Sequence, residues 1–243
     1  TTFFSSAALP RTTSRGPRVK PLALVTGASR GIGRAIAVEL GRTHRVLVGG
    51  RDEAAVAEVV ASLPDAAPFL ADLTDEAAVA AACAGIERLD VLVHSAGILA
   101  HHGPVADAPS TAWRAVMEVN VIAPATLTRL LLPALRTAHG LVVFINSGAG
   151  LSAGPGWSVY AASKFALTAL ADALRAEETG QLKVTTVHPG RTATAMQVEL
   201  RAAEGGAYDP DAYLAAEDVA RAVRLAVDLP PGAGLNSLRI SPA

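Results

Sequence analysis

The stretch LALVTGASRGIG at residues 22–33 places a compact apolar run directly before a glycine-rich turn. The first four residues have the length and composition of a buried strand, and the residues after Gly33 have helical spacing. Gly27 permits a tight turn, Gly31 lets the backbone approach a pyrophosphate, and Gly33 lets the helix pack closely on the sheet. The helix N-terminus then offers free N–H groups to a phosphate. The stretch therefore predicts a dinucleotide-binding turn, with an ordinary glycine-rich turn as the alternative.

The rest of the chain alternates short apolar runs with longer helical patterns. Because the runs are apolar throughout, they are typical of parallel strands covered by helices on both faces. The pattern predicts an α/β fold, a doubly wound parallel sheet (Rossmann-like) in three α/β/α layers. We expect strands at 22–25, 46–48, 68–71, 91–94, 141–145, 183–187 and 238–240. We expect helices at 33–41, 53–62, 76–84, 111–137 with an interruption near Pro124, 160–179 and 216–228.

Composition limits the function classes. The chain has 243 residues, of which 51% are hydrophobic and 18% charged, which suits one domain at 21–243 with a substrate lid at about 195–215. The net charge of −1 gives no reason to expect nucleic acid or an anionic membrane as partner. The longest apolar stretches are broken by Arg, Pro or Gly, so we expect no membrane span. Cys83 is the single cysteine, which fits a reducing compartment, and we expect a cytoplasmic protein.

Residues 1–20 form an N-terminal basic tail that differs from the rest. The tail contains Arg11, Arg15, Arg18 and Lys20 and no acidic residue. Organelle transit peptides have such a composition, and a flexible tail is the alternative interpretation.

A second motif carries the chemistry. Tyr160 and Lys164 form a YxxxK pattern, and residues four apart share one face of a helix. Tyrosine is a poor acid or base near neutrality because its pKa is about 10, and a neighbouring ammonium group lowers that value. Ser147 follows the most apolar strand, where its hydroxyl can hydrogen-bond a substrate oxygen and position it for the tyrosine. A strand-end turn residue is the alternative for Ser147.

These motifs resemble those of the short-chain dehydrogenase/reductase family, in its single-domain form with TGxxxGxG and YxxxK. The likeness extends from Pro21 nearly to the C-terminus. It implies hydride transfer between a nicotinamide cofactor and a carbonyl or alcohol. It also implies that Lys164 contacts the nicotinamide ribose and that Asn120 holds a water in a proton relay. A polar residue inside a helix, bonded to the backbone, is the alternative for Asn120.

Charge at the end of the second strand bears on the choice of cofactor. NAD enzymes place an acid there, whereas NADP enzymes favour arginine near the 2′-phosphate. By the resemblance Gly50 occupies the acid position and Arg51 the phosphate-binding one, and Arg30 lies just before Gly31 as a second base. These residues predict NADP(H). Asp52 could instead turn inward and favour NAD, and Arg51 could be a solvated loop charge.

The resemblance implies further cofactor contacts. Asp72 would hydrogen-bond the adenine amino group, with a helix cap or loop acid as the alternative. The chain has His94-Ser95-Ala96-Gly97 where the family usually has Asn-Asn-Ala-Gly, so any stabilising asparagine contact must be replaced or lost. The remaining expected cofactor residues are Ser29, Ile32, Leu73, Ala96, Gly97, Pro189, Gly190, Thr192 and Thr194.

Two residues are candidates for the substrate pocket. Trp157 lies one turn before Tyr160, and Met196 lies in the lid; packing within the lid or beside it is the alternative. The pair His101-His102 has no accompanying cysteine or carboxylate cluster, so we expect no metal site.

These observations together predict an NADP(H)-dependent oxidoreductase that reduces a small-molecule carbonyl to an alcohol, or the reverse, with Tyr160 as general acid/base. The alternative is an NADP(H)-binding regulatory or scaffold protein of the same fold, which would tolerate loss of the tyrosine or lysine. The helices at 111–137 and 160–179 resemble those that pair subunits in the family. We therefore expect a homodimer or homotetramer.

Overall fold

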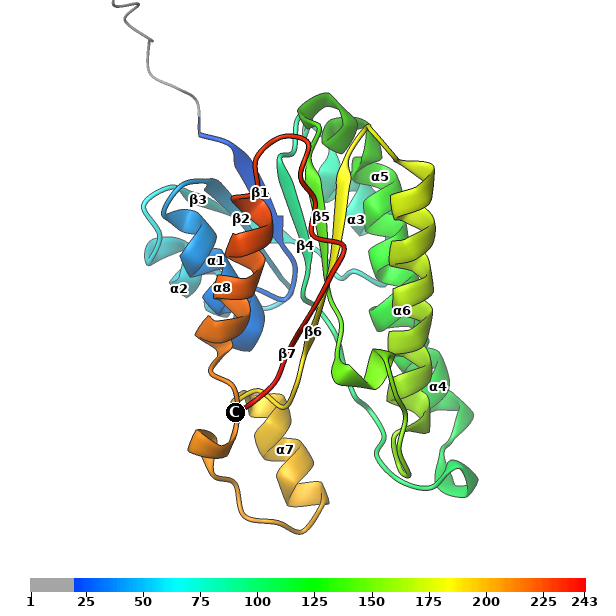
Figure 1. The fold of residues 1–243 in the computed structure, drawn as a ribbon. Coiled ribbons are helices and arrows are strands. Elements are labelled where there is room, and N and C mark those ends of the chain that lie inside the picture. Colours follow the sequence, from blue (N-terminus) through cyan, green and yellow to red (C-terminus); the bar gives the residue numbers. More distant parts are fainter. Residues whose placement is uncertain (1–19) are drawn as a thin grey trace, which may run out of the picture.

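The protein is a parallel α/β sheet protein, as a computed structural model of the chain shows for residues 20–243 (Figure 1). Seven parallel strands lie in the order β3-β2-β1-β4-β5-β6-β7, with helices on both faces. This confirms the predicted doubly wound fold. The prediction for the basic tail lies outside the described residues, apart from Lys20. The strands are β1 Leu22–Val25, β2 Arg45–Gly50, β3 Ala66–Leu70, β4 Val91–His94, β5 Leu141–Ile145, β6 Lys183–Pro189 and β7 Ser237–Ile240.

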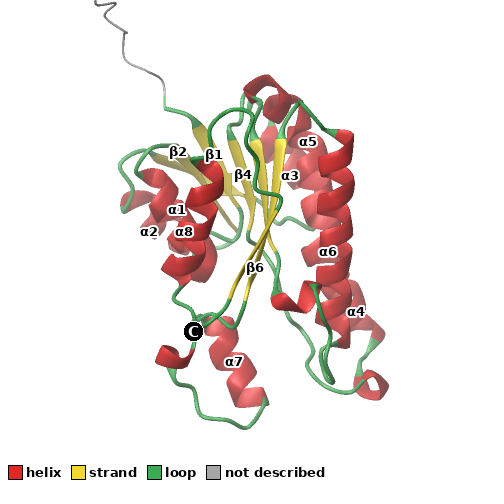
Figure 2. Cartoon of the chain, in the orientation of Figure 1, coloured by secondary structure: helices red, strands yellow, loops and turns green. Residues whose placement is uncertain are grey.

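The helices form the two outer layers (Figure 2). Helices α1, α2 and α8 cover one face of the sheet, and α3, α5 and α6 cover the other. Helix α7 stands apart at the carboxyl ends of the strands, in the segment expected to form the lid. The helices are α1 Gly31–Gly41, α2 Glu53–Ala61, α3 Glu76–Cys83, α4 Ser110–Met117, α5 Ala123–Ala138, α6 Ser158–Glu177, α7 Ala195–Ala203 and α8 Ala216–Val227.

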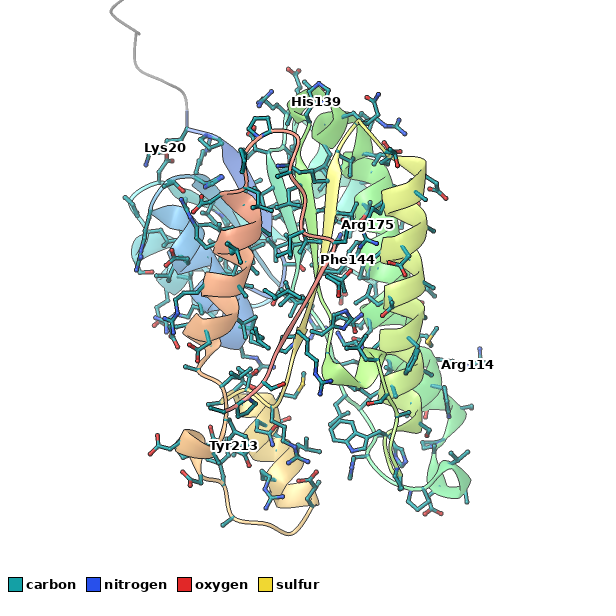
Figure 3. The ribbon with its side chains drawn as sticks, in the orientation of Figure 1. Lys20, Arg114, His139, Phe144, Arg175 and Tyr213 are labelled. Atoms are coloured by element: carbon teal, nitrogen blue, oxygen red, sulfur yellow. The ribbon has the colours of Figure 1, made fainter. Side chains whose placement is uncertain are left out.

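Each face of the sheet has its own apolar core. On one side Val25, Val48 and Val143 pack against α1 and α8. On the other, Leu92 and Phe144 pack against α5 and α6, and Figure 3 shows Phe144 between the sheet and these helices. Because consecutive strand residues point to opposite faces, a strand buried on both sides must be apolar at every position. This is why the runs carry no polar alternation.

The interruption of the long helix lies near Pro124, as predicted. It is a π-helical turn over Glu118–Ile122, and Pro124 is the second residue of α5. The helical backbone continues from the π turn into α5, and the turn lies directly before the proline, which has no N–H to donate within the helix. A π turn inserts one extra residue into the helix and often marks a functional position. Here it carries Asn120.

The expectation about membrane spans needs one correction. By length and composition, the helical segment Ser110–Ala138 is apolar enough to cross a membrane, with 39% of its apolar window buried inside the protein. The buried side of α5, with Leu127, Leu131 and Leu135, belongs to the core against the sheet. Core helices pass the same test, so this segment gives only weak evidence of membrane insertion.

Candidate active site

The glycine-rich turn after β1 is locked to the loop after β4. Gly27 has a φ of +61°, and a Cβ atom there would lie 2.8 Å from the Cα of Ala96. The Thr26 hydroxyl accepts hydrogen bonds from the backbone N–H groups of Ser95 and Ala96, at 3.0 and 3.2 Å. The two loops therefore form one rigid surface at the carboxyl end of the sheet, with small residues facing each other.

The same turn leaves the start of α1 open. Gly31 has a φ of +54°, and a Cβ atom there would lie 3.3 Å from Cγ2 of Thr194. A Cβ atom on Gly33 would lie 2.2 Å from the carbonyl oxygen of Gly27. Glycine is thus required both for the turn and for the close packing of helix on turn. Thr194 follows β6, in the other half of the sheet, and lies beside this turn. A dinucleotide that spans both halves of the sheet would have its middle at this point.

The end of β2 bears on the adenosine side of such a site. A Cβ atom on Gly50 would lie 2.6 Å from Cγ2 of Val56, so the position has no room for an acidic side chain without movement. Asp52 caps α2 by accepting a hydrogen bond from the N–H of Ala55 at 3.1 Å. Its carboxylate is therefore committed to the helix. Arg51 is exposed at this edge.

Asp72 has local partners. Its Oδ1 accepts hydrogen bonds from the backbone N–H and the hydroxyl of Thr74, at 3.0 and 2.8 Å, and these lower the pKa of the carboxyl group. Its Oδ2 lies 3.6 Å from the Arg51 guanidinium. The adjacent Asp75, not Asp72, caps α3. Asp72 is thus a loop acid beside the predicted adenosine site, with one oxygen turned to Arg51.

The candidate catalytic residues converge at the carboxyl end of β5. Ser147 follows β5, and its Oγ accepts a hydrogen bond from the N–H of Ala149 at 3.1 Å. Tyr160 and Lys164 lie one turn apart on α6. The Lys164 Nζ donates to the carbonyl oxygen of Ile145 at 3.1 Å and lies 5.5 Å from the centre of the Tyr160 ring. One strand and one helix therefore hold all three side chains together.

Burial, rather than charge, dominates the titration of this pair. Burial raises the pKa of Tyr160 to about 12, and hydrogen bonding with Ser147 opposes the rise. Burial lowers the pKa of Lys164 to about 8. The expectation that Lys164 lowers the tyrosine pKa is therefore not met in the free protein. The Tyr160 hydroxyl is protonated at neutral pH, which is the form that can donate a proton.

The low pKa of Lys164 leads to a stability prediction for the cofactor-free protein. The unfolded chain binds this proton up to about pH 10.5, whereas the folded chain releases it near pH 8. The contribution of Lys164 to the free energy of unfolding should therefore rise by up to about 3 kcal/mol across this window, because the unfolded state binds more protons there and one pKa unit corresponds to about 1.4 kcal/mol; above about pH 9 the raised pKa of Cys83 acts in the opposite direction. Urea titrations from pH 7 to 10 would measure it. Lys164→Met should abolish the rise, and Lys183→Met should keep it. Identical pH profiles for Lys164→Met and the parent would contradict the assignment.

Asn120 is positioned by the π turn and is fully engaged. It is 1% exposed. Its Oδ1 accepts from the N–H of Ile98 at 2.8 Å, and its Nδ2 donates to the carbonyl oxygen of Ile98 and the hydroxyl of Ser163. A Cβ atom on Gly97 would lie 3.3 Å from Asn120 Oδ1 and 3.8 Å from Lys164 Nζ. Asn120 thus ties the loop after β4 to the helix that carries Tyr160 and Lys164.

Two histidines support the site, and sequence reasoning did not assign them this part. His188 on β6 is buried, and its Nδ1 lies 3.1 Å from the carbonyl oxygen of Ser147. His94 replaces the usual asparagine; its Nε2 lies 2.8 Å from the Thr128 hydroxyl, and its ring stacks on Phe144 at 4.9 Å. Burial lowers the pKa of His94 to about 3, so its ring is neutral. His94 thus connects β4 to α5 through its contact with the Thr128 hydroxyl.

A cleft of about 430 Å³ opens over Ser147 and Tyr160. Its walls come from the loop after β5, the segment after β6 and the first turn of α7. Trp157 and Met196 line it, as expected, and the Trp157 ring meets the Tyr160 ring edge to face at 5.9 Å. Other expected cofactor residues that line it are Ile32, Pro189, Gly190, Thr192 and Thr194. A larger hollow of about 670 Å³ lies between α1 and α8; Gly31 and Ala193 line it, but none of the candidate catalytic residues does.

Tyr208, Tyr213 and His102 do not line the cleft. Tyr208 and Tyr213 stack on each other at 5.6 Å within the lid segment. His102 packs edge to face against Trp157 at 5.0 Å. Within residues 20–243 no group of three or more histidine, cysteine, aspartate or glutamate side chains could hold a metal ion.

The comparisons with known proteins place this geometry in a family. The sequence profile of the short chain dehydrogenase family matches residues 21–205. An uncharacterized short-chain type dehydrogenase/reductase of Sinorhizobium fredii is 36% identical over 227 residues, which is 91% of each chain. A short-chain dehydrogenase of Escherichia coli complexed with NADPH has a TM-score of 0.83 at 29% identity, over 92% of this chain and 98% of that one. One of Shigella flexneri complexed with NADP has a TM-score of 0.82 at 29% identity, over 90% and 95%.

The chain therefore belongs to the short-chain dehydrogenase/reductase family, and it is an oxidoreductase of that family. The sequence-based prediction of the family is confirmed.

Proposed function

We propose that this protein reduces a carbonyl compound to an alcohol, or catalyses the reverse reaction, with NADP(H) as hydride donor or acceptor. The observation that carries the proposal is the convergence of Ser147 and Tyr160 on one cleft with the segment Pro189 to Thr194. A nicotinamide held by that segment would supply the hydride to a carbonyl beside the two hydroxyls. The oxidoreductase class is that of the family; the direction and the cofactor preference are our proposals.

Each residue of the constellation has a distinct part in the proposed mechanism. Ser147 donates a hydrogen bond to the carbonyl oxygen and holds it in place. Tyr160 donates its proton to that oxygen as negative charge develops on it. Lys164, once charged, stabilises the phenolate that remains and restores its proton. The side chain of Asn120 hydrogen-bonds Ile98 and Ser163. We also propose that Asn120 holds a water molecule that takes part in a proton relay.

The charges at the end of β2 support NADP(H). Gly50 has no room for the acid that holds the ribose of NAD, and Asp52 is committed to capping α2. Arg30, within the glycine-rich turn, and Arg51, directly after β2, are both exposed. Two relatives of similar structure contain NADP or NADPH. A 2′-phosphate is the chemical group that this pair of arginines would bind.

We expect Arg51→Ala to raise the dissociation constant for NADPH by about tenfold, the size of one charge-assisted hydrogen bond. Affinity for NADH should stay the same, because NADH lacks the phosphate. The ion pair of Arg51 with Asp72 is exposed and contributes only about 0–1 kcal/mol, so a phosphate can displace it. Fluorescence titration of both nucleotides would measure the effect. Unchanged NADPH affinity would contradict the assignment of Arg51.

The test of the function is nicotinamide absorbance with a panel of ketones, aldehydes and 3-oxoacyl thioesters. NADPH and NADH are run in parallel, with Tyr160→Phe as control. Turnover that prefers NADPH and is lost in the variant would support both parts of the proposal. Tight NADPH binding without turnover of any member would favour a nicotinamide-binding regulatory or scaffold protein. The intact Tyr160 and Lys164 favour the enzyme over that alternative.

Three further expectations, on the domain bounds, the localisation and the oligomeric state, remain proposals. We infer one domain over residues 21–243 with its lid at about 195–215. The single cysteine, Cys83, favours a cytoplasmic protein. Helices α5 and α6 favour a homodimer or homotetramer, and light scattering that gives the mass of a monomer would contradict this.

A further inference from the structure

The cleft has an arginine that no acid neutralises. Arg239 on β7 lines the cleft from the outer edge of the sheet, paired in register with His188 on β6. In the described part of the chain no carboxylate lies within ion-pair distance of its guanidinium. The other arginine of the cleft, Arg191, is held by two hydrogen bonds to Glu204, at 2.6 and 3.0 Å. None of the side chains that line the cleft is acidic. Arg239 is exposed, so the cleft carries a positive charge that solvent, rather than a carboxylate of the described residues, compensates.

A second lining residue of the cleft carries a hydrogen-bond donor that has no acceptor within residues 20–243. Gln197 lies in the first turn of α7 and is 6% exposed, yet it lines the cleft. Within residues 20–243 no group accepts from its Nε2, which is fully enclosed. A buried donor without a partner is costly, so such groups in native proteins are commonly completed by a ligand or a water. The side chain of Gln197 lines the cleft, so its amide can donate to an acceptor there once the enclosed Nε2 turns toward the cleft.

We propose that the substrate is an anionic carbonyl compound, with its acidic group bound by Arg239 and Gln197 while its carbonyl lies at Ser147 and Tyr160. This proposal rests on the proposed function, because it names the substrate class of the same site. Carboxylates and phosphates match the donors of a guanidinium fork, and the amide of Gln197 can complete either. A cleft of about 430 Å³ that also holds the nicotinamide leaves room for a small acid.

The arrangement separates the two anion sites of the protein. Arg51 and Arg30 lie at the glycine-rich turn, at the adenosine end of the predicted cofactor site. Arg239 lies on β7, in register with His188 of β6, whose Nδ1 lies 3.1 Å from the carbonyl oxygen of Ser147. A variant of Arg239 should therefore affect the substrate and leave the cofactor unaffected.

The experiment compares acidic carbonyl compounds with neutral partners of the same shape. The pairs are 4-formylbenzoate with its methyl ester, and glyceraldehyde 3-phosphate with glyceraldehyde. We expect the parent protein to favour an acidic member in kcat/KM. Arg239→Met should reduce that preference by about tenfold through KM, the effect of one charge-assisted hydrogen bond. The pair with the larger loss identifies carboxylate or phosphate as the bound group.

Gln197 is tested by two substitutions of similar size. Gln197→Glu places an acceptor and a negative charge on the wall, and should raise KM for the acidic member more than Gln197→Met does. The KM for NADPH should stay constant in both. Arg114→Met is the matched control, because Arg114 is exposed on α4, points away from the molecule and does not line the cleft (Figure 3).

Two results would overturn the proposal. One is equal kcat/KM for the acidic and neutral members in the parent protein. The other is a change in KM for NADPH alone, which would assign Arg239 and Gln197 to the cofactor. Calorimetry with benzoate and benzamide on the protein–NADP⁺ complex separates this proposal from the proposed function, since it needs no turnover. Benzoate binding that Arg239→Met abolishes would support the anion site even if no carbonyl is reduced, and absence of benzoate binding would contradict it.

Discussion

Tyr160→Phe is expected to lower kcat by about 10²–10⁴-fold, the usual contribution of a positioned general acid. The hydroxyl is the group that the substitution removes, and at neutral pH it carries its proton because burial raises the pKa of Tyr160 to about 12. The phenyl ring stays, and with it the edge-to-face contact to Trp157 at 5.9 Å. NADPH affinity and the melting temperature should therefore change little.

The control for this prediction is Tyr208→Phe. Tyr208 stacks on Tyr213 in the lid segment and does not line the cleft, so loss of its hydroxyl should leave kcat unchanged. Stopped-flow measurement of a single turnover separates the hydride step from product release. Full turnover by Tyr160→Phe would show that another group donates the proton, and would remove Tyr160 from the proposed mechanism.

Local patterns were enough to predict the sheet and most of its helices; α7 Ala195–Ala203 was expected only as part of a lid. Strands such as Leu141–Ile145 are buried on both faces, so their apolar composition is visible without knowledge of the partner strands. The glycine-rich turn was equally readable, because the glycines at 27 and 33 lie against backbone atoms with no room for a Cβ atom. The order of the strands was not predicted and comes from the structure.

Contacts between distant segments could not be read in this way. Gln197 and Arg239 are separated by more than one helix in the chain, and only the fold shows that both line the cleft. His188 and His94 serve the site through a carbonyl oxygen and a hydroxyl that no local pattern identifies. The direction of the Tyr160 pKa also depends on burial, which the spacing of Tyr160 and Lys164 does not reveal.

The place of the break in the long helix could be predicted, but its role in the site could not. Proline is the strongest helix breaker in a sequence, so the prediction rested on Pro124. In the structure the irregular turn just before it also carries Asn120, whose amide binds both the N–H and the carbonyl oxygen of Ile98. A residue of the site is thus associated with the break as well as the proline.

Gly33→Ala is expected to destabilise the protein by about 1–3 kcal/mol, the usual cost of overpacking a close contact. Helix propensity alone predicts the opposite, because alanine stabilises a helix interior by about 1 kcal/mol relative to glycine. Contact should outweigh propensity here, since the new Cβ atom would lie 2.2 Å from the carbonyl oxygen of Gly27 and 3.1 Å from the Cα of Ala28. Both are backbone atoms, so no side-chain rotation can relieve the overlap.

The same displacement should weaken NADPH binding by about tenfold or more, because α1 and the turn after β1 move apart and the N–H groups that face a phosphate lose their alignment. Urea denaturation and NADPH titration would measure the two effects. Gly234→Ala is the control: the nearest atom to its Cβ is 4.0 Å away, so stability and affinity should hold. A more stable Gly33→Ala protein with normal NADPH affinity would mean that α1 can move away from the turn without loss of stability or of affinity. The close packing at Gly33 would then have no part in forming the cofactor site.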